Sequence, residues 1–180
     1  MHDSDTLIRY NEADGMSNNR VYCIAEDLSG NIWVGTYNGA SILSLLSDRK
    51  YAIKHIMGVN KKGKGTPVYF IFRDSFGDMW LGTGKGVSRF RGEMVTDYTI
   101  ADGLPDDKVR HIMEDRSGTL WFSTKEGICR FITSGIDSGR FLPVPGSDSM
   151  LLGVSVQATL QDKYGNLWIG TTEGLLKYDL

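Results

Sequence analysis

The residues best suited to bind a ligand occupy positions at which four otherwise similar stretches of this sequence differ. They combine aromatic rings with cationic, amide and carboxylate groups. The set is Arg20, Tyr22, Tyr37, Asn38, Tyr69, Lys85, Asp107, Lys108, Arg110, Lys125, Gln157 and Glu173. Aromatic planes beside hydrogen-bond donors suit a carbohydrate, and a surplus of basic members would favour an anionic sugar. The alternative for each residue is a solvated loop position that binds nothing.

Catalytic and metal-binding sets are hard to assemble from this sequence. His2, His55 and His111 are widely separated and lack the spacing of a metal site. Cys23 and Cys129 lie in apolar alternating stretches, so we expect buried thiols and no disulfide framework. No Ser–His–Asp set and no paired carboxylates can be assembled. We therefore expect no enzymatic activity, no cofactor and no metal site in this chain.

The elements that position the candidate residues come from a repeat that contains all four tryptophans. In each copy an Asp precedes the Trp by six positions, a Gly precedes it by three, and another Gly follows it by six. The copies are Asp27–Gly39, Asp74–Gly86, Asp115–Gly127 and Asp162–Gly174. Successive tryptophans are 47, 41 and 47 residues apart. A period in this range, with strand-like units, is typical of propeller blades.

The third copy shows how one repeat is expected to fold. Val109, His111 and Met113 alternate with polar or opposite-facing residues, which predicts a strand with a packed histidine. Strands are predicted at 109–115, 119–124, 128–132 and 139–144. Short glycine-containing turns join them, and no segment has a sustained helical period. The sequence therefore predicts an all-β fold made of β-propeller blades of four antiparallel strands, with four repeats in the chain.

A single propeller domain or segment is predicted over residues 1–180. The blades are expected at about 14–57, 66–100, 102–145 and 152–180, after an N-terminal strand at 7–10. Because the last repeat ends without a fourth strand, the N-terminal strand could complete it and remove an open edge. Three arrangements follow: a closed ring of four blades, one ring shared by two copies of the chain, or an arc completed by neighbouring blades.

The Asp, Gly and Trp of the repeat have a structural explanation. The carboxylate can accept hydrogen bonds from the free N–H groups of the turn that follows it, and the Gly permits that turn. The Trp is expected to pack between adjacent blades. We call an aspartate that holds its turn in this way a staple. We expect the four aspartates to be staples and not metal ligands, because they would lie on separate blades.

The overall composition indicates an ordinary globular protein. Hydrophobic residues make up 41% of the chain and charged residues 23%, and the net charge is -2. Such a weak charge does not favour nucleic acid or direct membrane contact as a partner. No secretory leader or long apolar run is recognised. The basic run at 61–65 is expected to be a solvated loop.

The repeated pattern resembles the two-component regulator propeller repeat over nearly the whole chain. The residues that carry the resemblance are 21–43, 68–90, 109–131 and 156–178, together with the connectors DGMSNN at 14–19 and DGLPDD at 102–107. The resemblance implies a non-catalytic sensor segment of a bacterial hybrid histidine kinase, in which such propellers detect glycans. It implies a periplasmic or otherwise extracytoplasmic location within a larger membrane receptor. A complete chain of this length would instead be expected in the cytoplasm.

The sequence departs from the family pattern at several points. Arg73 replaces the Glu or Gln of the other copies, and Ser123 replaces the Gly that follows the Trp by two positions. The family also builds rings of about seven blades, more than the four repeats found here. Homodimerisation or contact with neighbouring blades is therefore an expected partner interaction, beside a glycan ligand.

Two alternative functions remain at this point. The near-neutral charge fits a structural or oligomerisation module without a small-molecule ligand. The stretch at 119–131 also resembles the repeats of the streptogramin lyase propeller, which would make the chain an enzyme.

Overall fold

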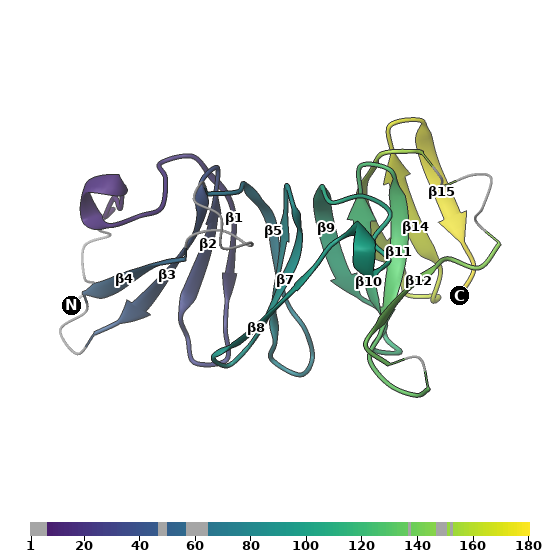
Figure 1. Cartoon of the computed structure of the whole chain (residues 1–180), viewed down its shortest axis with the longest axis horizontal. Helices are drawn as coiled ribbons and strands as arrows, with labels where there is room; N and C mark the ends of the chain where they lie inside the picture. Colours follow the sequence, from purple (N-terminus) through teal and green to yellow (C-terminus); the bar gives the residue numbers. More distant parts are fainter. Residues whose placement is uncertain (1–6, 47–49, 57–64, 137, 147–150, 152) are drawn as a thin grey trace.

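Alternating apolar and polar residues, interrupted by glycine turns, produce four antiparallel sheets arranged in a row (Figure 1). The computed structural model describes residues 7–46, 50–56, 65–136, 138–146, 151 and 153–180. The first sheet contains β1 (Val21–Glu26), β2 (Ile32–Thr36), β3 (Gly39–Leu45) and β4 (Tyr51–Ile56). The second contains β5 (Val68–Arg73), β6 (Met79–Thr83), β7 (Gly86–Arg91) and β8 (Met94–Tyr98).

The remaining strands form two further sheets with the same order. The third contains β9 (Val109–Glu114), β10 (Leu120–Thr124), β11 (Gly127–Ile132) and β12 (Arg140–Pro143). The fourth contains β13 (Val156–Gln161), β14 (Leu167–Thr171) and β15 (Gly174–Tyr178). We refer to the sheets as blades 1 to 4. The first strands of successive blades contact each other and form the inner side of the row. The predicted all-β fold of propeller blades is confirmed.

The hydrophobic core lies mainly between the blades. The ring of Trp33 in blade 1 meets Phe90 of blade 2 edge-on, with centroids 5.2 Å apart. Trp80 of blade 2 meets Phe131 of blade 3 in the same way at 5.1 Å. Trp80 is fully buried. Trp33 and Trp80 therefore each join their own blade to the third strand of the next one, as the sequence predicted.

The aspartate of each repeat staples its turn, which confirms the structural interpretation. In blade 3, Oδ1 of Asp115 accepts hydrogen bonds from the backbone N–H groups of Ser117 and Thr119, at 2.8 and 3.0 Å. Its Oδ2 accepts from Nε1 of Trp121 at 2.8 Å. The other three blades repeat this indole bond at 2.9, 2.8 and 3.0 Å. The indole bond was missed from the sequence, which suggested only packing for the tryptophan.

Two short 3-10 helices, also missed from the sequence, form the connectors before blades 1 and 3. They are η1 (Glu12–Asp14) and η2 (Ile100–Asp102). Each begins with a capping box. The side chain of the residue before the helix accepts from the backbone N–H of the last helical residue, and the acidic side chain of that last residue accepts from the backbone N–H of the residue before the helix. Each ends at a glycine with a φ near +100°, Gly15 at 101° and Gly103 at 105°.

The N-terminal segment differs from the prediction. Residues 7–10 form no strand; Tyr10 instead packs its ring against Tyr51 of β4 in blade 1. Blade 4 accordingly has three strands, and blades 1 and 4 lie at opposite ends of the row (Figure 1). The single chain therefore forms an open row, and the closed ring of four blades is not formed.

The remaining sequence features are placed as follows. Cys23 and Cys129 are free thiols; burial raises the pKa of Cys23 to about 11 and also raises that of Cys129. His2 and most of the basic run at 61–65 lie outside the described residues. In the part of the chain that the structure describes, no helix is long and apolar enough to cross a membrane.

Candidate functional site

Each inner strand carries a β-bulge close to its first residue. In β1, Val21 pairs with Thr36 and Cys23 pairs with Gly35, so the residue between them has no partner in the ladder. The corresponding unpaired residues of the four blades are Tyr22, Tyr69, Arg110 and Gln157. A bulge redirects the side chain of its extra residue and is frequent beside functional sites. The backbone therefore releases from pairing a position at which the repeats differ.

Because of its bulge, β9 does not follow the strict alternation that the sequence predicted for it. Val109 and Ile112 are both buried in the core between blades 2 and 3, whereas strict alternation placed them on opposite faces. His111 is packed as predicted, with its ring 4.5 Å from that of Phe70 and its Nδ1 3.1 Å from Oγ1 of Thr159. Burial lowers the pKa of His111, which favours the neutral ring at pH 7.

A row of aromatic rings and cations extends from blade 1 to the start of blade 3. The guanidinium carbon of Arg20 lies 5.3 Å from the ring centroid of Tyr22 and 5.9 Å from that of Tyr37. The rings of Tyr22 and Tyr69 are 5.7 Å apart, and Nζ of Lys108 lies 5.3 Å from the ring of Tyr69. The structure thus brings five of the predicted residues together, and we call this group the rim.

Two bulge residues in blades 3 and 4 form a polar pair. Nη1 of Arg110 donates to Oε1 of Gln157 at 2.8 Å, and Nε2 of Gln157 donates to Oγ of Ser155 at 2.9 Å. The Nε atom of Arg110 is buried and has no hydrogen-bond partner among the described residues. An unpaired buried donor is costly. An acceptor oxygen from a ligand would therefore stabilise this position.

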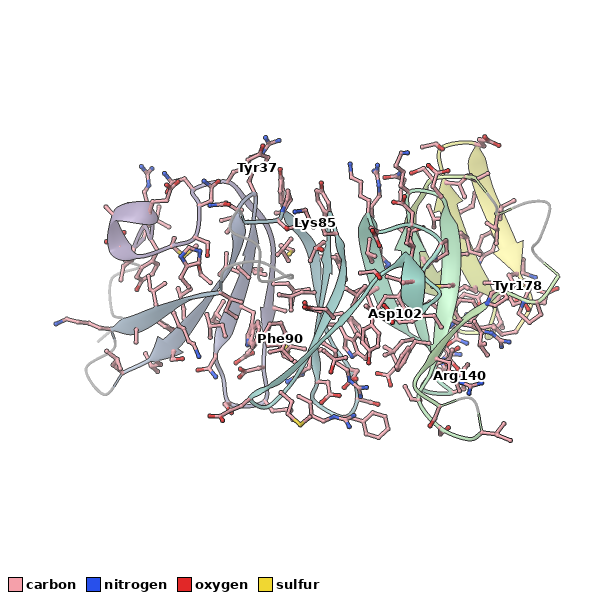
Figure 2. The ribbon with its side chains drawn as sticks, viewed as in Figure 1. Tyr37, Lys85, Phe90, Asp102, Arg140 and Tyr178 are labelled. Carbon is pink, nitrogen blue, oxygen red and sulfur yellow. The ribbon has the colours of Figure 1, made fainter. Side chains whose placement is uncertain are left out.

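Two further cations lie at the tips of turns. Lys85, in the turn between β6 and β7, is exposed at the same edge of the molecule as Tyr37 (Figure 2). Lys125, in the turn between β10 and β11, forms an ion pair with Glu126 at 2.7 Å, and this hydrogen-bonded pair raises the pKa of Lys125. The positive charge of Lys125 is therefore partly compensated by its neighbour.

The remaining three predicted residues also lie outside the contacts of the rim. Oδ1 of Asp107 accepts from the backbone N–H of Ile100 at 2.9 Å, so this carboxylate holds a connector. Asn38 lies against Gly65, where an added Cβ would be only 2.1 Å from Oδ1 of Asn38. Glu173 is exposed in the turn between β14 and β15. The capping pattern of the connector was the sequence signal that could have identified the role of Asp107.

The opposite end of the inner strands contains a groove that the sequence did not predict. Its volume is about 600 Å³, and it lies between the stapled turns of blades 2 and 3. Its wall includes Ser75, whose backbone N and Oγ donate to Glu114 at 2.7 and 2.6 Å. Within the described residues, no three His, Cys, Asp or Glu side chains form a group that could hold a metal ion.

Repeated antiparallel blades of four or three strands, with stapled turns at one end of the inner strands and bulges at the other, define the class of this protein as a β-propeller. Its sequence matches the family model of the two component regulator propeller at residues 15–38, 62–85, 103–126 and 150–173, which is more than half of the chain. The chain therefore belongs to the two component regulator propeller family. The predicted resemblance is confirmed.

Solved structures from bacteria share this fold. The extracellular domain of BT3049, assigned to a hybrid two component system of B. thetaiotaomicron, is 26% identical with a TM-score of 0.77; the match covers 99% of this chain and 24% of that one. Virginiamycin B lyase from Staphylococcus aureus is 18% identical with a TM-score of 0.60, covering 92% of this chain and 58% of the lyase. The chain thus spans about a quarter of the BT3049 domain. No curated protein was found to be similar.

Proposed function

We propose that this chain is a non-catalytic, ligand-sensing propeller segment of a two-component signalling receptor, and that its rim binds a carbohydrate. Membership of the propeller family and similarity to the extracellular domain of a hybrid two component system support the sensor role and an extracytoplasmic location. The likeness to the lyase supports only a shared fold.

The observation that carries the carbohydrate proposal is the composition of the rim. Tyr22 and Tyr69 present two neighbouring aromatic rings, and Arg20 and Lys108 lie beside them. Aromatic faces can stack on the apolar face of a sugar ring, while cationic donors bind its hydroxyl or carboxylate oxygens. Arg110 adds a buried donor without a partner among the described residues. The cations favour a sugar that contains carboxylate groups.

Calorimetric titration with two sets of oligosaccharides tests the proposal. One set contains neutral hexoses and the other contains uronates of the same length. We expect binding of the uronate set to weaken as salt is raised, since exposed charges are screened. We also expect Tyr69→Ala to reduce the affinity at least tenfold, because it removes one ring of the pair.

The chain offers a matched control at the opposite edge. Tyr164 is 79% exposed, and Nζ of Lys163 lies 4.9 Å from its ring, so this pair has the same chemistry outside the rim. Tyr164→Ala should leave the affinity unchanged. Equal losses in Tyr69→Ala and Tyr164→Ala, or no binding of either set of oligosaccharides, would contradict the proposal and favour a structural module without a sugar ligand.

A further inference from the structure

A small pocket between blades 2 and 3 contains two arginines and lies at the stapled end of the inner strands, away from the rim. Its volume is about 240 Å³. It adjoins the larger groove between the stapled turns, because Phe76 and Thr133 line both. Arg89 and Arg91 of β7 supply its cationic wall. Blades 2 and 3 each have a neighbour on both sides (Figure 1), so the pocket does not arise from an open end of the row.

The two arginines share a single carboxylate. Oδ2 of Asp78 accepts from Nε of Arg89 at 2.7 Å and from Nε of Arg91 at 3.0 Å. The Nη2 atoms of the same arginines lie 2.6 and 3.0 Å from this oxygen. Two positive charges and one negative charge leave a net charge of +1 on this group. The Asp78 side chain is 7% exposed, so the excess charge lies beside a largely buried ion pair, where salt screens it less than on an open surface.

Both arginines retain donors that Asp78 does not use. A guanidinium carries five N–H groups, and Asp78 accepts from Nε and Nη2 only. Arg89 is fixed in place, since its guanidinium carbon lies 4.8 Å from the ring centroid of Trp80 and its side chain is 15% exposed. The Arg91 side chain is 60% exposed. Arg91 is therefore the donor that a ligand in the pocket can reach most easily.

This arrangement departs from the repeat. The position of Asp78 holds Asn31 in blade 1 and Asn166 in blade 4, and each Asn donates from Nδ2 to the aspartate of its own staple at 2.8 Å. An ionised carboxylate cannot donate, and Asp78 binds the arginines instead. At the position of Arg91 the other blades hold Ser44, Ile132 and Asp179. The shared frame of the blades therefore does not require the pair of arginines.

The rest of the described wall suits an oxyanion with a small organic body. Thr133 and Ser138 supply hydroxyl groups, and no acidic side chain lines the pocket among the described residues. Phe76 is 65% exposed and offers an apolar surface in the same wall. Guanidinium groups bind carboxylate and phosphate oxygens through charge-assisted hydrogen bonds, which are stronger than neutral ones. The pocket thus combines cationic donors, hydroxyl groups and one aromatic side chain.

We propose that this pocket binds a small ligand through a carboxylate, sulfate or phosphate group, and that Arg91 is its main contact. The volume lies below the range of about 300–1,000 Å³ that is typical of drug-sized ligands, which restricts the occupant to a small anion or a small organic acid. The rim lies at the opposite end of the inner strands. Anion binding here is therefore independent of the proposed sugar binding.

NMR titration that follows the Nε–H signals of Arg89 and Arg91 tests the proposal. The probes are phenylacetate, its neutral analogue phenylacetamide, and inorganic sulfate, all added at constant ionic strength. We expect saturable shifts with the anions and at least tenfold weaker binding of the amide than of the acid. Tighter binding of phenylacetate than of sulfate identifies an organic acid as the preferred occupant, and the reverse order identifies an inorganic anion. The lack of a saturable shift with both anions, or equal affinities for the acid and the amide, would overturn the proposal.

Removal of the excess charge tests the assigned contact. Arg91→Gln leaves Asp78 paired with Arg89, so the fold should be retained while the anions bind at least tenfold more weakly. Unchanged anion affinity in this variant would contradict the assignment of Arg91. The comparison of acid and amide needs no variant, so it decides for or against the pocket even if Arg91→Gln does not fold.

Two control variants separate this contact from a general charge effect and from the rim. Arg130→Gln makes the same charge change in β11, but Arg130 alternates with Phe131 of the pocket wall and lies on the opposite face of the strand. Arg130→Gln and Tyr69→Ala should both bind the anions as the native chain does. Equal losses in Arg91→Gln and Arg130→Gln would show that only the net charge matters and would rule out a local site.

Discussion

The two ends of the inner strands differ in a simple way. At one end, four aspartates hold four turns with the same hydrogen bonds, including an indole bond of 2.8–3.0 Å in every blade. At the other end, the four bulges carry two tyrosines, an arginine and a glutamine. The stapled end must satisfy buried backbone and indole donors in each blade, so its chemistry repeats. The bulge residues have no partner in the strand ladder, so their side chains are free to differ from blade to blade.

The largest expected effect is the loss of a buried staple. Asp115→Ala leaves two turn N–H groups and the indole N–H of Trp121 without an acceptor, so we expect a loss of roughly 3 kcal/mol in the free energy of unfolding. Urea unfolding measures this loss. The matched variant Asp162→Ala in the more exposed end blade should be less harmful. An equal effect in both blades would break the contrast between inner and end positions.

A smaller effect is expected at two adjacent residues of β10, one that repeats in every blade and one that does not. Oγ1 of Thr124 donates to the carbonyl oxygen of Gly127 at 2.8 Å, and all four blades repeat this bond. Thr124→Val should cost about 1–2 kcal/mol. The adjacent Ser123 replaces a glycine of the other copies, and its buried Oγ has no partner among the described residues. Ser123→Ala should therefore be neutral or stabilising by up to about 1 kcal/mol in the same unfolding assay.

Substitutions at the bulges should change stability still less. Arg110→Ala and Gln157→Ala remove a 2.8 Å hydrogen bond between two side chains near the surface. We expect each to alter the free energy of unfolding by about 0.5 kcal/mol or less, with a similarly small coupling in a double-mutant cycle. A coupling of several kcal/mol would show that the bulge residues belong to the frame of the fold.

The smallest expected effect is the acid response of a staple at the end of the row. Hydrogen bonds from Asn166 and Trp168 lower the pKa of Asp162 from 3.8 to about 2. Because the folded pKa is depressed, the stabilisation is present above pH 3.8 and is lost as the pH falls towards 2. NMR titration of the carboxylate should show this pKa, and Asn166→Ala should raise it. An unchanged pKa in that variant would remove the assigned cause.

Much of the frame could be predicted from the sequence because it repeats. The spacing of Asp, Gly and Trp predicted turns, strands and blade packing, and each was found. Periodicity alone could not locate the bulges, since an extra residue such as Arg110 changes the face of its neighbours without changing the strand composition. It also could not show that residues 7–10 form no strand, because strand pairing depends on what lies beside a segment as well as on its composition.

The candidate site was predicted less completely than the fold. Comparison of the repeats identified Tyr22, Tyr69, Arg110 and Gln157 as variable positions, and these proved to be the bulge residues. It did not separate Asp107, which holds the backbone of its own connector, from residues whose side chains are free for a ligand. That distinction depends on a hydrogen bond that spans seven residues, as seen in the connectors before blades 1 and 3.

The order of the blades has a consequence for how this chain folds. Side-chain hydrogen bonds between blades 2 and 3 and between blades 3 and 4 link residues 39, 47 and 48 positions apart. β1 of blade 1 likewise contacts β5 of blade 2, so every blade contacts the blades next to it in sequence. A structure of this kind is nearly one-dimensional, and its stability is close to a sum over units and their junctions. The chain can therefore nucleate at an inner junction and extend in both directions, and it should lose its terminal blades first when it unfolds.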